Sequence, residues 1–547
     1  MNYKDTYNTW LNNPHIDTEI REKLKKMDDN EIKESFYGNL SFGTGGMRGI
    51  LGIGTNKLNI YTVRKVTLGY ASYLHKYIKN SSSKGIVIGH DNRHNSRDFC
   101  LDCAALLSSR GIKVHIFDSL RPTPEISYAI RKLGASGGII ITASHNPKEY
   151  NGYKVYDATG CQLVDYDCNL LIEEINKIDD ILSFKFESNQ SLINILSNDF
   201  DKEYYAEIKK ISLNKIDNNN FKIVYSPQHG AALEGVKNIL TSVNYNLYLV
   251  ESQCTPDPNF SNTLCPNPED SRAYIEAIKL AKEIDAHLIL TTDPDGDRIG
   301  AAVKNNNGDY ILLNGNQIGA LILDYILTYK KHDDNSLVIS TIVTSNLISN
   351  IAISNNVFFK QTLTGFKYIG KIVNEFESTK NFTFGVEESC GYLISNITRD
   401  KDAIQAALII AEMACYYNNH NSSLLEKLDK IYTKYGYYYD KVAVYKLNPI
   451  TGPNEINKIM NKLRNIKINN FANYKIKKIE DYINGYQDFP KSNVLKFIFE
   501  DDSFIAIRPS GTEPKYKIYF SLKSLDENDG KIKFNVIEKA LIDYIKN

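Results

Sequence analysis

Short apolar runs alternate with amphipathic stretches from residue 84 to about residue 430. Apolar runs at residues 84–89 and 112–117 flank a stretch with helical periodicity that contains Cys100 and Cys103. The alternation recurs with apolar runs at 221–225, 286–290 and 337–342, and with helical patterns at 271–282 and 316–330. Strands that alternate with helices predict βαβ units and a mostly parallel sheet covered on both faces.

The last part of the chain follows a different pattern. An aromatic, strand-like stretch at 435–442 is followed by a helical stretch rich in Lys and Asn, and then by paired strands around 496–508. This order is typical of an α+β domain rather than of βαβ repeats. The length of 547 residues predicts about three to four domains. We therefore expect several α/β units followed by a separate C-terminal domain.

Three apolar strands each run into an unusual polar loop. The strands at 138–141, 287–290 and 382–385 lead into the loops at 142–147, 291–298 and 386–391, respectively. Ligand sites collect at the carboxyl ends of the strands in parallel α/β sheets. The three loops therefore predict three α/β units that contribute to one cleft.

Composition and charge limit the class of protein. Lys+Arg and Asp+Glu both number 65, so the formal net charge is zero, which argues against a nucleic-acid binder. The hydrophobic content of 42% is ordinary for a soluble globular chain, and no apolar run approaches the ~18 residues of a membrane span. The N-terminal residues lack the apolar region of a secretory signal. We expect a cytoplasmic protein with no nucleic-acid partner, no membrane partner and no obligatory protein partner.

The cysteines support the same compartment. All eight are scattered along a long chain, which indicates reduced thiols rather than a disulfide framework. Cys100 and Cys103 form the only CxxC motif, and no second pair stands at a spacing that would complete a zinc site. We therefore expect both thiols to pack on the buried face of a helix.

The strongest local signal is a group of three carboxylates. Asp293, Asp295 and Asp297 stand at i, i+2 and i+4 in a Pro/Gly turn that directly follows an apolar strand. Crowded carboxylates repel one another unless a cation lies among them. Oxygen ligands favour a hard ion, and Mg²⁺ is the usual one where a phosphate shares the coordination. The alternative, a solvated acidic turn, fits less well after a buried strand.

Ser144 is a candidate nucleophile in the loop Thr142–Pro147. A hydroxyl at a strand end can carry a phosphoryl group when a base and a metal ion lie close to it. The pair of Ser144 and His145 is weak evidence alone, because turns favour Ser, Asn and Pro for conformational reasons. Lys154 could supply proton transfer or positive charge, although a single Lys is usually a surface residue.

Two further segments have the composition of anion sites. Arg508, Ser510, Gly511 and Thr512 combine a guanidinium group, two hydroxyls and a glycine amide after a strand, which is typical of a phosphate grip. The glycine-rich segment at 43–49 lacks the Lys-Ser/Thr of a P-loop, although Arg48 could face an anion.

Taken together, these segments resemble the α-D-phosphohexomutase superfamily of phosphoglucomutases and phosphomannomutases. The resemblance runs in order through residues 43–49, 89–93, 142–147, 293–298, 364–367, 387–391 and 508–515. Each segment alone is modest evidence, and the ordered set is highly specific. The length and the segments 256–260 and 399–403 are similar to the long phosphoglucomutase/phosphomannomutase branch, which also contains phosphopentomutases.

The resemblance implies four domains around a central cleft, three of them similar βαβ mixed-sheet α/β units and the last a smaller α+β domain. We place the boundaries at 1–195 (phosphoserine loop), 196–310 (metal-binding loop), 311–430 (sugar-binding loop) and 431–547 (phosphate-binding loop).

The resemblance also implies roles for individual residues. Ser144 would carry the phosphoryl group, and one of its oxygens would complete a Mg²⁺ site formed by Asp293, Asp295 and Asp297. The expected substrate-binding residues are Arg298, Thr364, Gly365, Glu387, Ser389, Arg508, Ser510, Gly511 and Thr512. The expected catalytic residues besides Ser144 are Arg48, His145, Lys154 and Lys401. His145 and Lys401 compete with Lys154 for the proton-transfer role, and the sequence leaves that choice open.

The implied reaction is the reversible interconversion of α-D-glucose 1-phosphate and glucose 6-phosphate. It would proceed through phosphoserine and glucose 1,6-bisphosphate, which would also act as an activator. The sequence Glu387-Glu388-Ser389 is a glucose-type variant of the sugar loop, whereas mannose phosphates and pentose phosphates remain alternatives.

Two other classes of protein stay open from the sequence. A haloacid-dehalogenase-like phosphatase would use Asp293 as its nucleophile after a similar strand, but that hypothesis leaves Ser144 and the Arg508 segment unexplained. A catalytically inactive sugar-phosphate sensor is disfavoured because Ser144 and the three aspartates are all present.

Overall fold

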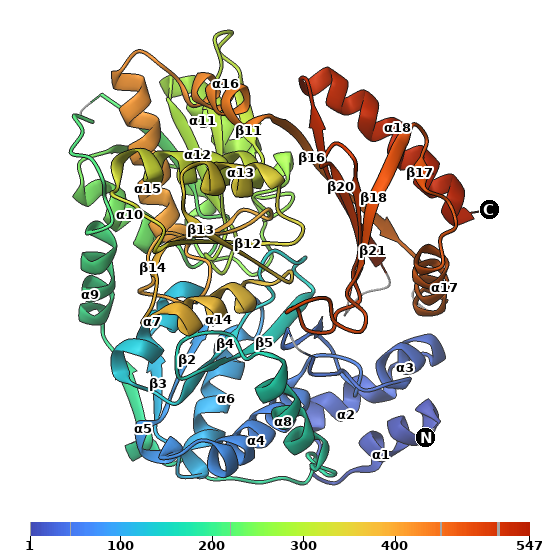
Figure 1. Ribbon diagram of the computed structural model, residues 1–547. Coiled ribbons are helices and arrows are strands. Elements are labelled where there is room, and N and C mark those ends of the chain that lie inside the picture. The colour runs from blue at the N-terminus through green and yellow to red at the C-terminus, as the bar shows by residue number, and fades with distance from the viewer. Residues whose placement is uncertain (1, 44, 219, 449–450, 511–514, 547) are drawn as a thin grey trace. The chain divides into compact units, whose positions relative to one another are not determined.

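The computed structural model describes residues 2–546 apart from 44, 219, 449–450 and 511–514 (Figure 1). The described chain forms two compact units. The first comprises Met1–Leu312, Gly370–Glu375 and Gly391–Cys415, and the second comprises Leu313–Ile369, Phe376–Cys390 and Tyr416–Asn547. No described helix is long and apolar enough to cross a membrane.

The first unit contains a six-stranded mixed sheet in the order β1-β5-β4-β2-β3-β6. Strands β2, β3, β4 and β6 are parallel, and β5 pairs antiparallel with β4 and β1. The strands are β1 (Met47–Ile50), β2 (Ile86–His90), β3 (Val114–Phe117), β4 (Gly137–Ile141), β5 (Tyr150–Asp157) and β6 (Ile193–Leu196).

Helices cover both faces of this sheet. The apolar side chains of its buried strands point alternately to one face and to the other, so both faces need to be covered. On one face, Ile88 belongs to the core cluster that includes Cys103, whereas Val87 belongs to a cluster with Ile126 on the other face. The helices are α4 (Ile60–Tyr77), α5 (Ser81–Lys84), α6 (Ser96–Ser109), α7 (Thr123–Leu133) and α8 (Asp165–Asn176). Both thiols of the CxxC motif are buried in α6, which confirms their packing role.

Three short N-terminal helices precede this sheet and have a small core of their own around Trp10 and Phe36. They are α1 (Tyr3–Asn12), α2 (Thr18–Lys25) and α3 (Asp29–Phe36).

The second sheet of the first unit has the order β11-β10-β9-β7-β8. Its strands are β7 (Lys222–Ser226), β8 (Asn246–Leu249), β9 (Leu288–Thr292), β10 (Ile299–Lys304) and β11 (Tyr310–Leu313). Its neighbouring helices are α9 (Asn198–Lys209), α10 (Leu233–Ser242) and α11 (Ile275–Ile284). The metal-loop strand β9 is buried over its whole length and is parallel to β7.

In the second unit, β12 (Ser336–Thr341) lies between β13 (Phe358–Thr362) and β14 (Asn381–Glu387) and is parallel to both. Helices α12 (Gly315–Tyr329) and α13 (Asn346–Ser354) flank this sheet. The remaining elements up to residue 435 are divided between the units. Strand β15 (Gly391–Leu393), α15 (Ala403–Asn419) as far as Cys415 and residues 370–375 of α14 (Phe366–Phe376) belong to the first unit, and α16 (Leu424–Tyr435) belongs to the second.

The C-terminal part of the second unit is an antiparallel sheet in the order β16-β21-β20-β19-β18-β17. The strands are β16 (Tyr437–Lys446), β17 (Asn470–Phe471), β18 (Tyr474–Asp481), β19 (Leu495–Phe499), β20 (Phe504–Pro509) and β21 (Lys515–Ser524). Helices α17 (Gly452–Arg464) and α18 (Glu527–Lys546) pack on it around Met460 and Ile537.

The architecture confirms the predicted fold class of three α/β units followed by an α+β domain. Every strand and helix that the hydrophobic pattern predicted is present, with ends shifted by a few residues. The exact domain boundaries and the shared central cleft stay predictions.

Candidate active site

Ser144 lies in the loop after β4, with its backbone in the left-handed region at φ 52°. Its hydroxyl donates to Oδ2 of Asp293 at 2.7 Å, and Nδ1 of His145 lies 3.1 Å from the Ser144 hydroxyl oxygen. The backbone N–H of Ser144 donates to the hydroxyl of Thr142 at 2.8 Å. The fold therefore brings the predicted nucleophile and the predicted metal loop into direct contact.

The three aspartates of that loop are completely buried or nearly so. One ligand oxygen from each lies within 4.8 Å of the others. Burial raises the pKa of Asp293 well above its usual range, and the carboxylates of Asp295 and Asp297 add to the rise. Burial also opposes the charged form of Asp295, but Lys154, a hydrogen bond with Asp293 and the charge of Lys401 together outweigh burial and lower the pKa of that carboxyl.

These residues fit a hard divalent cation. Oδ1 of Asp295 and Oδ1 of Asp297 are buried and have no hydrogen-bond partner among the described residues. A buried carboxylate oxygen without a partner is costly, and a cation that accepts electron pairs from it removes that cost. The acidic triad is therefore compatible with a metal ion and differs from a solvated acidic turn.

Two lysines balance the negative charge of the triad. Nζ of Lys154 lies 3.0 Å from Oδ2 of Asp295, and Nζ of Lys401 lies 3.1 Å from Oδ2 of Asp297. Both lysine side chains are only 10% exposed, which is unusual for this residue and indicates a specific role for the charge.

A buried carboxylate orients the second of these lysines. Asp400 lies 2.9 Å from Nζ of Lys401 and accepts a hydrogen bond from the hydroxyl of Tyr156 at 2.8 Å. Asp400 belongs to a segment that carried the resemblance, but no local pattern assigned it a role.

The other predicted residues of the first unit surround the same loops. Nη1 of Arg48 donates to Oδ1 of Asn146, two residues beyond Ser144, at 3.1 Å. The backbone N–H of Arg298 donates to Oδ1 of Asp293 at 3.0 Å, and its guanidinium group pairs with Glu269 at 2.9 Å. The structure therefore gathers Arg48, Ser144, His145, Lys154, the acidic triad, Arg298 and Lys401 into one site.

In the second unit, the predicted sugar loop is held by its own carboxylates. Oε1 of Glu387 accepts a hydrogen bond from the backbone N–H of Gly365 at 2.8 Å. Oε2 of Glu388 accepts hydrogen bonds from the hydroxyls of Thr341 and Thr344, each at 3.3 Å. Glu387 therefore joins the two segments that contain Thr364, Gly365 and Ser389, and their role in sugar binding stays a prediction.

The predicted phosphate grip is only partly described. Arg508 is half-buried on β20 and stands opposite Lys517 of β21, and the backbone N–H of Ser510 donates to the carbonyl oxygen of Lys515 at 2.8 Å. Gly511 and Thr512 lie outside the described residues.

Arg93 is a part of the site to which the sequence assigned no role. Its guanidinium group is buried and donates hydrogen bonds to backbone carbonyl oxygens of the Ser144 loop. The segment 89–93 was part of the resemblance, so the signal was present, but the sequence does not show which loop this arginine holds.

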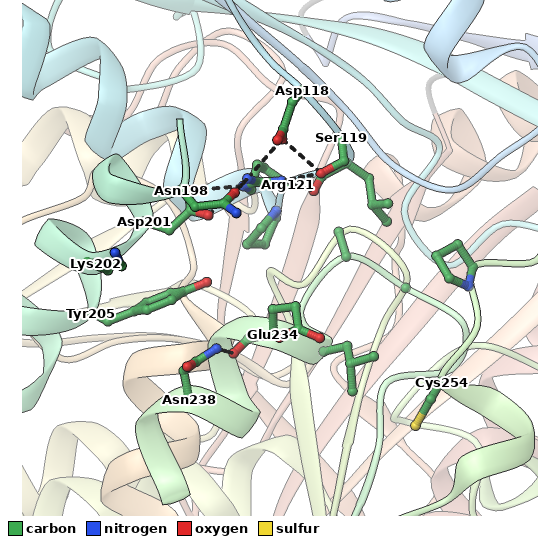
Figure 2. A pocket seen from close by; sticks show the side chains of 16 residues that line it. Asp118, Ser119, Arg121, Asn198, Asp201, Lys202, Tyr205, Glu234, Asn238 and Cys254 are labelled. Carbon is green, nitrogen blue, oxygen red and sulfur yellow. Dashed lines mark hydrogen bonds and ion pairs between the residues drawn. The ribbon is translucent and has the colours of Figure 1, made fainter. Parts of the chain in front are cut away.

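A separate pocket of about 480 Å³ lies in the first unit, and one of its wall residues contacts the metal loop (Figure 2). The backbone N–H of Ala231, in its wall, donates to the carbonyl oxygen of Pro294 at 2.8 Å. The donors of Arg121 are engaged by Asp118, Ser119, Asn198, Asp201 and its neighbour Leu120. This pocket contains none of the predicted site residues. Arg121 makes hydrogen bonds that hold the loop preceding α7.

A buried serine beside an acidic triad, both at strand ends of an α/β fold, defines a class of phosphoryl-transfer enzymes. Three family models match the chain: the phosphoglucomutase/phosphomannomutase alpha/beta/alpha domain I over residues 39–181, domain II over 202–308 and domain III over 314–435. The chain belongs to the phosphoglucomutase/phosphomannomutase family, within the α-D-phosphohexomutase superfamily.

Individual relatives agree with this membership. A phosphoglucomutase of Staphylococcus aureus (strain MRSA252) is 38% identical over 536 residues, which cover 95% of this chain and 96% of the relative. Two solved structures share the fold at 20% identity. A putative phosphomannomutase from Thermus thermophilus has a TM-score of 0.71, covering 92% of this chain and 99% of its own. The open form of parafusin, a phosphoglucomutase from Paramecium, has a TM-score of 0.70, covering 93% and 96%.

The alternative of a haloacid-dehalogenase-like phosphatase finds no support in this geometry. Oδ2 of Asp293 accepts the Ser144 hydroxyl, and Oδ1 accepts the backbone N–H groups of Asp297 and Arg298. A nucleophilic carboxylate needs an oxygen that faces the substrate, whereas both oxygens of Asp293 are engaged inside the protein.

Proposed function

We propose that the protein is a phosphoglucomutase that interconverts α-D-glucose 1-phosphate and glucose 6-phosphate through phospho-Ser144. The contact between the Ser144 hydroxyl and Asp293 carries this proposal, because the group that would accept the phosphoryl group touches an acidic triad that is compatible with a metal ion. The identity to curated phosphoglucomutases over nearly the whole chain supports glucose phosphates as the substrate class.

Each half-reaction exchanges one P–O bond for another. The bond between phosphorus and Oγ of Ser144 breaks while a bond forms between phosphorus and a free hydroxyl oxygen of the sugar phosphate. The hydroxyl proton passes to one of Lys154, His145 and Lys401, and the product is glucose 1,6-bisphosphate. The reverse transfer, from its other phosphate, restores phospho-Ser144 and releases the isomer.

Asp293, Asp295 and Asp297 would hold Mg²⁺ together with an oxygen of phospho-Ser144. When bound, Mg²⁺ supplies stabilisation of the charge that develops on the transferring phosphoryl group. Arg48 adds positive charge around the same atoms, and so does each of Lys154 and Lys401 that is not the proton acceptor. Such preorganised charge is usually the largest contribution to catalysis of this kind.

Other residues that the sequence predicts would bind the part of the substrate that does not react. Glu387 and Ser389 would accept and donate hydrogen bonds to sugar hydroxyls, with Thr364 and Gly365 beside them. Arg508, Ser510, Gly511 and Thr512 would grip the second phosphate, whose dianion suits a guanidinium group and hydroxyls.

Intact-mass measurement of the purified protein tests the proposal. We expect a covalent phosphoryl group on the wild-type protein and none on Ser144→Ala, which should also lose turnover of glucose 1-phosphate. Ser136→Ala, at a buried serine of the same domain, is the matched control and should keep both. Near-normal kcat/KM in Ser144→Ala would contradict the mechanism. Parallel assays with mannose 1-phosphate and ribose 1-phosphate would then define the sugar preference.

A further inference from the structure

Arg93 follows β2 and contacts four carbonyl oxygens, three in the Ser144 loop and one at the first residue of β5. Nη1 donates to the carbonyl oxygens of Pro147 at 2.8 Å and Tyr150 at 3.0 Å. Nη2 donates to the carbonyl oxygens of Ser144 and Asn146. The whole residue is 3% exposed, so water does not compete for these bonds. One planar cation thus fixes the backbone at the nucleophile and in the residues that follow it.

The guanidinium group is itself held in place from two directions. Asp91 lies 3.3 Å from its Nε and accepts hydrogen bonds from the backbone N–H of Arg93 and the hydroxyl of Ser96. The ring of Phe260 lies 5.1 Å from the guanidinium carbon, within cation–π range.

The conformation of Ser144 explains why such a support is needed. A residue other than glycine in the left-handed region is strained and persists only where its surroundings fix it. Here the φ of Ser144 is 52°, and its own carbonyl oxygen is one of the four that accept from Arg93. Without a cation between them, the converging carbonyl dipoles would repel one another and the loop would relax.

We propose that Arg93 is a positioning residue for phosphoryl transfer, which keeps the Ser144 oxygen directed at the metal site without contacting the sugar phosphate. This inference rests on the proposed function. A displacement of about 1 Å in a reacting atom can cost about a hundredfold in rate. Loss of Arg93 should therefore lower kcat by about a hundredfold, while KM for glucose 1-phosphate changes less than about threefold.

The experiment compares the full-length wild type with Arg93→Met, Arg93→Lys and Phe260→Leu. Arg93→Lys keeps the charge and part of the donor set, so kcat should recover to within about tenfold of the wild type. Phe260→Leu removes no buried charge and should fold normally, with kcat lowered severalfold and KM unchanged. Arg64→Met is the matched control, because Arg64 makes an ion pair with Asp102 at 2.6 Å on helices away from the Ser144 loop.

Thermal unfolding and transfer of the phosphoryl group in a single turnover are measured on every variant. A purely structural role predicts that Arg93→Met and Arg64→Met differ only in stability, and equal kcat values per folded molecule would overturn the inference. The inference would also be overturned if Phe260→Leu lowered kcat and raised KM by the same factor. If the wild type carries no phospho-Ser144 and has no mutase activity, the proposed function fails instead, so the two failures are distinguishable.

Discussion

At the scale of single residues, the site depends on charges that neutralise one another inside the protein. Ser144 and Asp293 are 149 positions apart in the chain, and their side chains meet at 2.7 Å. The ammonium groups of Lys154 and Lys401 pair with the carboxylates that would bind a metal ion. The lysines pair with the Oδ2 atoms, whereas the Oδ1 atoms have no hydrogen-bond partner among the described residues. Their positive charge therefore competes with a cation for the same carboxylate groups by repulsion, and binding of Mg²⁺ would weaken these ion pairs.

This competition gives a prediction for Lys154→Met. We expect Mg²⁺ to bind about tenfold more tightly than to the wild type, because one repelling charge next to Asp295 is removed, while turnover falls strongly. A tenfold change is about 1.4 kcal/mol, a part of the interaction of two unit charges a few ångströms apart. Calorimetric titration with Mg²⁺ checks it, with the surface residue change Lys132→Met as control. Equal or weaker Mg²⁺ affinity in Lys154→Met would show that the lysine does not compete.

At the scale of elements, helix starts and strand pairs position the loops that the sequence marked as functional. Helix α12 begins at Gly315, directly against the sugar loop after β14. Strand β16 pairs with β21, and Asp440 of β16 stands opposite Ser521. Both arrangements lie within the second unit, and each predicts a measurable effect of a small substitution.

Gly315→Ala should disturb the sugar loop. An added Cβ would overlap the carbonyl oxygen of Glu388 and lie 2.7 Å from the backbone nitrogen of Cys390, so the loop must move. We expect kcat/KM for glucose 1-phosphate to fall at least tenfold and stability to fall by about 1–3 kcal/mol. Gly38→Ala, where the nearest atom is 3.9 Å away, should change neither. Steady-state kinetics and thermal unfolding check this prediction. Equal kcat/KM and equal stability of the two variants would contradict it.

Asp440→Asn should change how stability depends on pH. Burial raises the pKa of Asp440 to about 7, and the Ser521 and Ser345 hydroxyls only partly offset the rise. Because this pKa is above the unfolded value of about 3.9, the folded protein binds the extra proton, and stability falls as pH rises from about 4 to 7. The Asn variant avoids that loss, so its Tm relative to wild type should increase from pH 5 to pH 8. Exposed Asp543→Asn should show no such trend.

At the scale of the whole molecule, the acidic triad belongs entirely to the first unit, whereas the C-terminal sheet belongs to the second. Each unit has its own buried apolar clusters, so ligand binding can stabilise one of them selectively. A ligand at about a hundred times its Kd stabilises the folded state by about 2.7 kcal/mol.

We therefore expect saturating Mg²⁺ to slow amide hydrogen exchange in the segments 142–147 and 293–298. Exchange in strands β18, β19 and β20 of the C-terminal sheet should stay the same, because none of their residues belongs to the acidic triad. The Asp295→Asn variant should lose the protection, since Oδ1 of Asp295 is one of the buried oxygens left without a partner among the described residues. Protection that persists in this variant would place the ion elsewhere.

The sequence determined the types of element and the chemistry of the loops, because both are written in local patterns. Apolar runs and helical periodicity indicate which residues are buried in strands and helices. Three carboxylates in one turn indicate a site that could hold a cation. Only the tertiary structure decided which distant side chains meet, such as Arg93 with the Ser144 loop and Lys401 with Asp297. A side chain's partner depends on the packing of elements far apart in the chain, and no local pattern encodes that packing.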